Sequence, residues 1–201
     1  MGKIKENQQK KRQELLENAF DLFTSKGVNE TTIQDIAKAA GVAKGTFYLY
    51  FKDKYDLIEK LRRKKTAKLF EEAVEFSRNT HYENFTEQLL IITNYIIDEL
   101  SNNQDLLKFI YKNLSMGIGI EKLYIDKETE NGDSAAKSIY EIFEERVIQD
   151  GLKLKDPRTT LFMVIELIGS TCYNAILYNI PLPIEEFKPF LNDAIRKLLN
   201  E

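Results

Sequence analysis

A glycine between two short amphipathic segments is the feature that most restricts how this chain can fold. The run from Thr32 to Asp53 reads TIQDIAKAAGVAKGTFYLYFKD. The hydroxyl of Thr32 can cap a helix that begins at Ile33, and Asp35, three residues after Thr32, completes an approximate capping box. Gly41 can adopt the positive φ that ends this helix and turns the chain into the next. The run therefore predicts two short helices joined at a sharp turn.

The second of these helices is expected from about Ala43 to Phe51. Phe47 and Phe51, four residues apart, define its inward face. The residues expected to face away from the core are Gly45, Thr46, Tyr48 and Leu49, with Lys44 at the N-terminal end. A helix-turn-helix protein places such outward side chains in the major groove of DNA.

Residues 10–60 resemble the DNA-binding domain of the TetR family of bacterial transcriptional repressors. The resemblance is specific in the run GVAKGTFYLYFKDKYDLI, from Gly41 to Ile58, and covers about the first third of the chain. It implies an all-α protein with a three-helix helix-turn-helix domain at residues 1–53. A long helix joins this domain to a helical effector-binding and dimerisation domain at residues 54–201.

The resemblance also implies which residues contact DNA. These are Thr32, Lys44, Thr46, Tyr48, Tyr50 and Lys54, to which we add Ile33, Gln34 and Gly45 from the same two short helices. We expect Lys54 and the Tyr48 hydroxyl to hold phosphates, and Lys44, Gly45 and Thr46 to reach base edges or thymine methyl groups.

The charge distribution agrees with a DNA-binding N-terminal third. The whole chain has a net charge of −3, but residues 1–65 contain 15 Lys and Arg against 9 Asp and Glu, whereas residues 66–201 contain 14 against 23. The basic third is where phosphates would be neutralised.

The rest of the sequence predicts helices and no convincing strand. An apolar stripe predicts a first helix over 10–26, and a fourth helix is expected from Lys54 to Arg78. Further helices are expected at 82–101, 105–115, 134–149, 157–179 and 184–199. Asp156 is expected to cap a helix with Pro157 in its first turn, and Gly151 is expected to end the preceding helix.

The last two predicted helices are candidates for self-association. The helix from Pro157 is apolar around most of its circumference. One neighbouring layer of helices would not cover all of this apolar surface. The resemblance implies that these helices form a four-helix interface in a homodimer. A two-fold dimer predicts a palindromic operator in double-stranded DNA.

We expect a soluble cytoplasmic protein with no membrane span. Glu166 and Asn174 interrupt the most hydrophobic stretch, which favours a buried or interface helix. A single cysteine, Cys172, fits a reducing compartment, and no signal-peptide pattern precedes the first helix. The lone histidine, His81, has no second histidine or nearby cysteine, so neither a zinc site nor a catalytic triad is supported. We expect no enzyme activity, no metal and no cofactor.

Aromatic and flexible residues between the two ends of the chain can either line an effector cavity or pack as ordinary core. The candidates are Tyr95, Phe109, Met116, Tyr140, Phe162, Glu166 and Tyr173. Glu166 must face solvent, pair with a base or await a cationic ligand, because an unpaired buried charge is costly. We expect it at a pocket rim or at the edge of the dimer interface.

The sequence thus predicts a repressor that a small-molecule effector releases from its operator. The alternative is a helical DNA-binding dimer that is controlled by a protein partner and has no small-molecule pocket. Stabilisation by a small molecule would separate the two.

Overall fold

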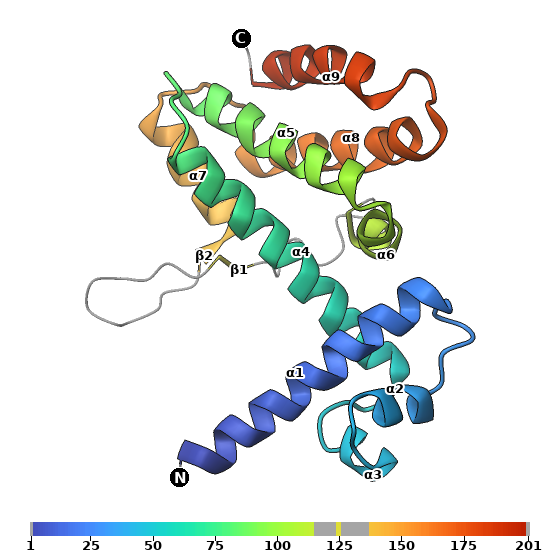
Figure 1. The fold of residues 1–201 in the computed structure, drawn as a ribbon. Coiled ribbons are helices and arrows are strands. Elements are labelled where there is room, and N and C mark those ends of the chain that lie inside the picture. The colour runs from blue at the N-terminus through green and yellow to red at the C-terminus, as the bar shows by residue number, and fades with distance from the viewer. Residues whose placement is uncertain (1, 115–123, 126–136, 200–201) are drawn as a thin grey trace. The chain divides into compact units, whose positions relative to one another are not determined.

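The computed structural model describes residues 2–114, 124–125 and 137–199 of the chain. Within these residues the structure is helical apart from one short strand pair, so the predicted all-α class is confirmed (Figure 1). The strands β1 (Tyr124–Ile125) and β2 (Lys137–Ser138) pair antiparallel, with Tyr124 opposite Ser138. The chain divides into two compact units, residues 1–64 (unit 1) and 65–201 (unit 2).

Unit 1 contains α1 (Gly2–Ser25), α2 (Ile33–Ala39), α3 (Lys44–Phe47) and the first part of α4 (Lys54–Arg78). Its core is formed by apolar side chains at helical spacing on each of these elements. They include Leu15, Leu16, Ala19, Ile36, Phe47, Phe51, Leu57 and Leu61, all at most 2% exposed. The predicted limits of α4 are confirmed. The predicted domain boundary between residues 53 and 54 coincides with the start of α4 and remains a prediction about which residues act together.

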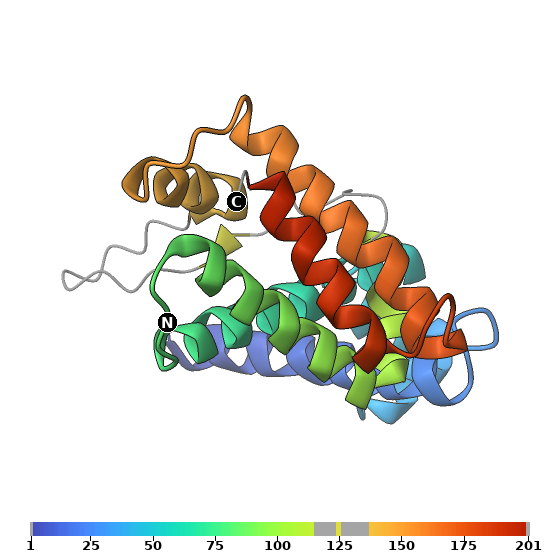
Figure 2. The same cartoon turned by 90° about the horizontal axis from the view of Figure 1, so that it is seen from above.

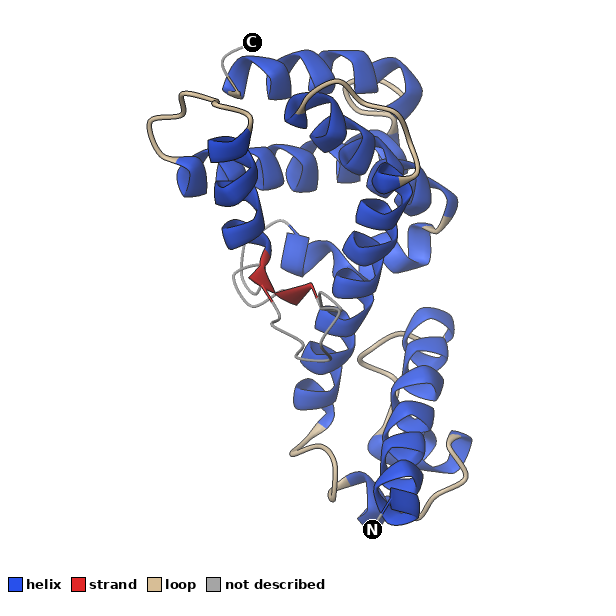
Figure 3. Ribbon diagram, turned by 90° about the vertical axis from the view of Figure 1, so that its left-hand side faces the viewer, coloured by secondary structure: helices blue, strands red, loops and turns tan. Residues whose placement is uncertain are grey.

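Unit 2 contains α5 (Phe85–Asn102), α6 (Gln104–Leu114), α7 (Ile139–Gln149), α8 (Pro157–Tyr178) and α9 (Ile184–Leu198). Helix α8 is its central element because it packs against α5, α6, α7 and α9. Figures 2 and 3 show α9 lying alongside α8. Each helix predicted in this part of the chain is present, with ends that differ by up to five residues. The helix predicted from residue 134 begins at Ile139, and Lys137 and Ser138 form β2 instead, although no strand was predicted, because Ser138 caps α7 in an extended conformation.

The start of α8 follows the predicted chemistry. The Asp156 carboxylate accepts a hydrogen bond of 2.8 Å from the backbone N–H of Thr159, and Pro157 occupies the first turn. Gly151, just after the end of α7, has a φ of +70°. Both predicted helix ends are therefore confirmed.

Helix α8 is long and apolar enough to cross a membrane by length and composition alone. The mean hydropathy of its most apolar 18-residue window is 1.5, and 44% of that window is buried within the protein. Its contacts with four other helices agree with the expectation of a buried or interface helix.

Candidate nucleic-acid interface and effector cavity

Helix α2 begins in a complete capping box. The Thr32 hydroxyl accepts a 3.1 Å hydrogen bond from the Asp35 N–H, and the Asp35 carboxylate accepts a 3.0 Å bond from the Thr32 N–H. The Lys26 ammonium donates a further 2.9 Å bond to this carboxylate. The Thr32 N–H, followed by Lys26, lowers the pKa of Asp35 to about 2. The predicted cap is confirmed, and Lys26 links it to the end of α1.

The turn between α2 and α3 is a Schellman motif around Gly41. The N–H of Val42 donates to the carbonyl of Ala37 at 2.9 Å, and the N–H of Gly41 donates to the carbonyl of Lys38 at 3.1 Å. Gly41 has the predicted positive φ, +66°. Because L residues with a Cβ rarely adopt this conformation, the turn direction depends on glycine.

Helix α3 is shorter than predicted. Regular helix ends at Phe47, although hydrogen bonds continue as far as Phe51, so we call residues 44–51 the recognition segment. The N–H groups of Leu49 and Tyr50 bond to carbonyls three residues back, at 3.2 and 3.0 Å, which tightens the chain out of α geometry. This tight turn brings Phe51 back to the core, where it is 1% exposed.

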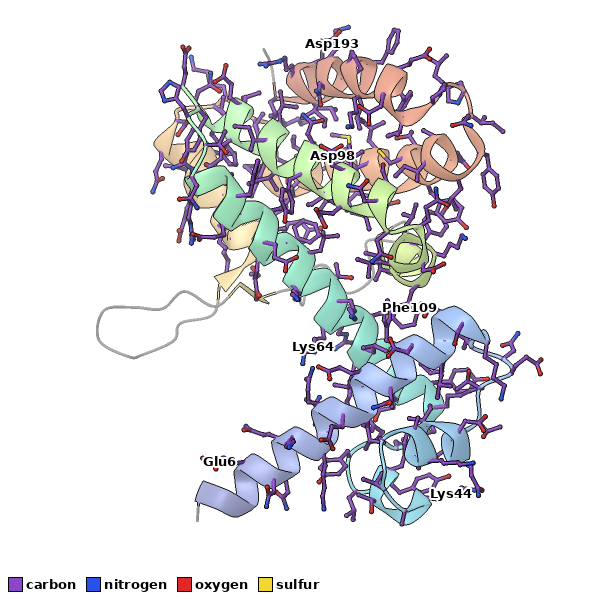
Figure 4. The ribbon with its side chains drawn as sticks, in the orientation of Figure 1. Glu6, Lys44, Lys64, Asp98, Phe109 and Asp193 are labelled. Carbon is purple, nitrogen blue, oxygen red and sulfur yellow. The ribbon has the colours of Figure 1, made fainter. Side chains whose placement is uncertain are left out.

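The recognition segment has the predicted inward and outward faces. Phe47 is 0% exposed and its ring centroid lies 5.4 Å from that of Phe51. Lys44, Gly45, Tyr48 and Leu49 are exposed, and Thr46 and Tyr50 are half-buried. Figure 4 shows Lys44 on α3 at the outside of unit 1. On α2, Thr32 and Gln34 are exposed and Ile33 is half-buried. Their predicted contacts with DNA remain predictions.

Leu49 was predicted to face away from the core but was not among the predicted DNA contacts. Its side chain is 78% exposed at the centre of the recognition segment, which makes it a further candidate for contact with thymine methyl groups. An apolar residue at a predicted outward position was the available signal.

Lys54 has intramolecular partners that its sequence position did not reveal. Its ammonium donates hydrogen bonds to the backbone carbonyls of Val28 at 2.8 Å and Thr31 at 3.0 Å. The Thr31 hydroxyl in turn donates to the carbonyl of Gly27 at 2.7 Å. Lys54 thus fastens the loop between α1 and α2 to the start of α4. Its predicted phosphate contact remains a prediction and would compete with these carbonyls.

Unit 2 contains a cavity of about 100 Å³ between α4, α5, α6, α7 and α8. Its described lining is almost entirely apolar. It includes Phe70, Leu89, Ile96, Phe143, Val164 and Ile168, with Thr93, Cys172 and Tyr173 supplying polar side-chain atoms. No charged side chain is among the described lining residues, and burial raises the pKa of the Cys172 thiol to about 12.

Of the predicted effector-binding residues, Tyr173 lines this cavity. Phe109 and Tyr140 are buried elsewhere, and Phe162 is 45% exposed. Tyr95 packs against Phe76, with ring centroids 4.9 Å apart. Met116 lies outside the described residues. Aliphatic side chains of α5 and α8 supply most of the wall instead.

Glu166 lies on the half-exposed side of α8. One of its carboxylate oxygens is buried without a hydrogen-bond partner, and burial raises its pKa. It does not belong to the described lining of the cavity. The position agrees better with the edge of an interface than with a ligand counter-charge.

Helices α8 and α9 expose large apolar side chains. Phe162 is 45%, Met163 41% and Phe190 64% exposed. Of the two small residues in the middle of α8, Gly169 faces the cavity and Ser170 is exposed on the outer face. An apolar surface of this kind is typical of a protein–protein interface.

Comparisons with known proteins agree with the helix-turn-helix geometry. Residues 15–61 match the sequence model described as bacterial regulatory proteins, tetR family. The chain is 46% identical over 59 residues to the HTH-type transcriptional regulator AcrR of Shigella flexneri, covering 29% of this chain and 27% of that protein. It is 31% identical over 130 residues to the probable acrEF/envCD operon repressor of Escherichia coli K12, covering 60% and 59%. The chain therefore spans between a quarter and three fifths of these relatives.

The fold extends the likeness over nearly the whole chain. The transcriptional regulator FadR from Bacillus subtilis, solved in complex with stearoyl-CoA, matches with a TM-score of 0.61 and 18% identity. The match covers 91% of this chain and 96% of that one. At this identity the likeness establishes the shared fold.

Proposed function

We propose that this chain, which belongs to the tetR family of bacterial regulatory proteins, is a sequence-specific DNA-binding repressor of the cytoplasm. It occupies a palindromic operator as a homodimer and leaves the operator when a small-molecule effector binds. The observation that carries the proposal is the recognition segment, in which Phe47 and Phe51 anchor the inner face while Lys44 and Tyr48 remain exposed where they can meet DNA.

In this proposal the recognition segment enters the major groove. Lys44, Gly45 and Thr46 contact base edges, because they form the start of α3 next to the turn, where Lys44 and Gly45 are exposed and Thr46 is half-buried. The Tyr48 hydroxyl and Thr32 hold phosphates. The remaining proposed contacts are Ile33, Gln34, Tyr50 and Lys54.

The homodimer is proposed to form through α8 and α9. Contact between two copies would cover Phe162, Met163 and Phe190, which a single copy leaves exposed. A closed two-fold dimer presents two equivalent recognition segments, and this symmetry requires a palindromic or nearly palindromic site.

The effector is proposed to place a neutral, apolar group in the cavity of unit 2. Apolar cavities of about 150 Å³ stay dry and bind molecules such as benzene, and a carboxylate or ammonium would find no charged partner in the described lining. The fold neighbour that holds stearoyl-CoA supports an acyl chain as one such group. A ligand larger than the cavity binds only if the walls move, and this requirement couples ligand binding to a second conformation.

Selection of binding sites from random duplex DNA tests the DNA-binding proposal. The full-length protein at near-physiological salt is expected to recover a palindromic motif. Lys44→Ala should weaken binding to that motif more than to random DNA, whereas Lys155→Ala, an exposed lysine of unit 2, should change neither. Recovery of no motif would contradict sequence-specific repression, and equal losses on both DNAs would contradict base contact by Lys44.

Thermal stabilisation by matched probes tests the effector proposal. We expect 1-decanol to raise the melting temperature more than decanoate or decylammonium. Val164→Phe, which fills the cavity wall, should abolish this stabilisation, while Ile148→Phe, at a 77% exposed site, should preserve it. No stabilisation of the unsubstituted protein by any probe would favour control by a protein partner.

A further inference from the structure

The first turns of α1 extend beyond the core of unit 1. Helix α1 begins at Gly2, whereas the apolar pattern predicted a start near Lys10. Residues 6–12 are exposed on every side of the helix, and the first buried side chain is Leu15. The family match also begins at residue 15. We call residues 2–12 the α1 extension. Its described side chains from residue 6 to residue 11 are exposed, so none of them supplies a buried contact that would account for the helical conformation.

The α1 extension replaces the apolar stripe of α1 with cations. Leu15 and Leu16 face the core, and the residues four positions before them are Lys11 and Arg12. Residues four apart lie on one face of a helix. These cations therefore point to the same side as the core residues, and not to the opposite, outer side of unit 1.

Arg12 connects this basic face to the recognition segment. Its guanidinium carbon lies 5.8 Å from the centroid of the Phe51 ring, the residue that closes the recognition segment. In Figure 1 the N-terminal end of α1 and helix α3 both lie on the lower side of unit 1, at its left and right. Glu6 and Lys44 mark these two places in Figure 4. A duplex that lies along this side of unit 1 would meet both α3 and the α1 extension.

The described lysines of the α1 extension have no acidic partner among the described residues of unit 1. Lys10 and Lys11 form no ion pair with any other residue that the structure describes. Glu6 is the only acid in the segment, against Lys3, Lys5, Lys10, Lys11 and Arg12. At 1.5 Å per residue the segment is about 15 Å long, and duplex DNA carries a phosphate charge about every 1.7 Å along its axis.

We propose that the α1 extension is a second DNA contact, which binds backbone phosphates beside the half-site that α3 reads. The proposal rests on the proposed DNA-binding function and adds a site outside the helix-turn-helix. Because phosphates carry no sequence information, this contact strengthens binding to the operator and to random DNA by the same factor.

The salt dependence of DNA binding tests this site. We compare the full-length protein with Lys10→Gln/Lys11→Gln on the selected operator and on random DNA between 50 and 200 mM salt. Removing one lysine that binds a phosphate lowers the slope of log K against log salt by about one, so a dimer with two variant subunits should show a slope lower by about four. The control Lys153→Gln/Lys155→Gln makes the same change of charge on unit 2 and should leave the slope unaltered.

The charge-retaining variant Lys10→Arg/Lys11→Arg should restore the slope, which separates the removal of charge from damage to α1. The proposal is overturned if Lys10→Gln/Lys11→Gln keeps the slope of the unsubstituted protein, or if its weaker binding is confined to the operator. An anionic membrane is the other surface that this basic segment could bind. The proposal is therefore also overturned if the variant loses binding to vesicles of anionic lipid while its DNA binding is unchanged. If the unsubstituted protein binds no DNA, the proposed function itself fails, and this result is distinguishable from the others.

Discussion

Replacing Lys54 with Met separates two roles of one ammonium group. In the structure this ammonium bonds to the carbonyls of Val28 and Thr31 at 2.8 and 3.0 Å. A hydrogen bond with a charged partner contributes about 1.5–3 kcal/mol. Two such bonds set an upper range of about 3–6 kcal/mol. Lys54 is half-buried, so water replaces part of this, and we expect Lys54→Met to lower the free energy of unfolding by about 2 kcal/mol.

Urea unfolding followed by circular dichroism measures this decrease. At an m-value of about 2 kcal/mol/M the midpoint should fall by about 1 M urea. Lys52→Met is the matched control, because its side chain is exposed and its hydrogen bond to Asp56 comes from the backbone N–H. It should stay within about 0.5 kcal/mol of the unsubstituted protein. All variants are compared at one protein concentration, since dimerisation contributes to stability.

The slope of log K against log salt for DNA binding then shows which partner the Lys54 ammonium has in the complex. If Lys54 keeps its carbonyls in the complex, Lys54→Met leaves the slope of log K against log salt unchanged. If it moves to a phosphate, the slope falls by about one per subunit. Unchanged stability together with a reduced slope would refute the structural role and support the contact expected from the sequence.

Three further predictions concern single features of the fold. Gly41→Ala should cost about 1–2 kcal/mol because of the left-handed backbone. Gly45→Ala, with open space around the new Cβ, should raise the free energy of unfolding by about 0.5 kcal/mol. Urea midpoints equal to that of the unsubstituted protein would contradict both glycine predictions. The unsubstituted protein should have a higher free energy of unfolding than Asp35→Asn, because the pKa of Asp35 is lowered in the folded protein. This difference should be full above pH 4 and disappear as the pH falls toward 2; a pH-independent difference would exclude this role of Asp35. Phe162→Glu should yield monomers in sedimentation while Ile148→Glu does not; persistent dimers would place the interface elsewhere.

Local chemistry made the motif predictable from the sequence. The capping box at Thr32 and the glycine turn depend on residues within a few positions of one another, so their identities suffice to indicate the geometry. Phe47 and Phe51 were placed correctly because inward residues recur at helical spacing. The limits of α4 followed from the same periodicity.

Features without an apolar pattern, or with distant partners, were not predictable. The α1 extension has no apolar stripe that indicates a helix, so the predicted start fell eight residues too late. The partners of Lys54 lie 23 and 26 residues earlier in the chain. The cavity wall depends on which side of each helix turns inward, and aromatic character alone could not separate Tyr173 from Tyr140.

The exposed residues of the recognition segment also bear on how such a regulator can evolve. Lys44 and Leu49 have no partner among the described side chains, so their replacement removes no intramolecular contact that the fold uses. Phe47 and Phe51 lie two to seven positions away and carry the packing of the same segment. Under the proposed function, mutation of these two residues would change which operator is recognised without first needing a compensating change elsewhere in the protein, and duplicated copies of the gene could acquire separate targets on one unchanged scaffold.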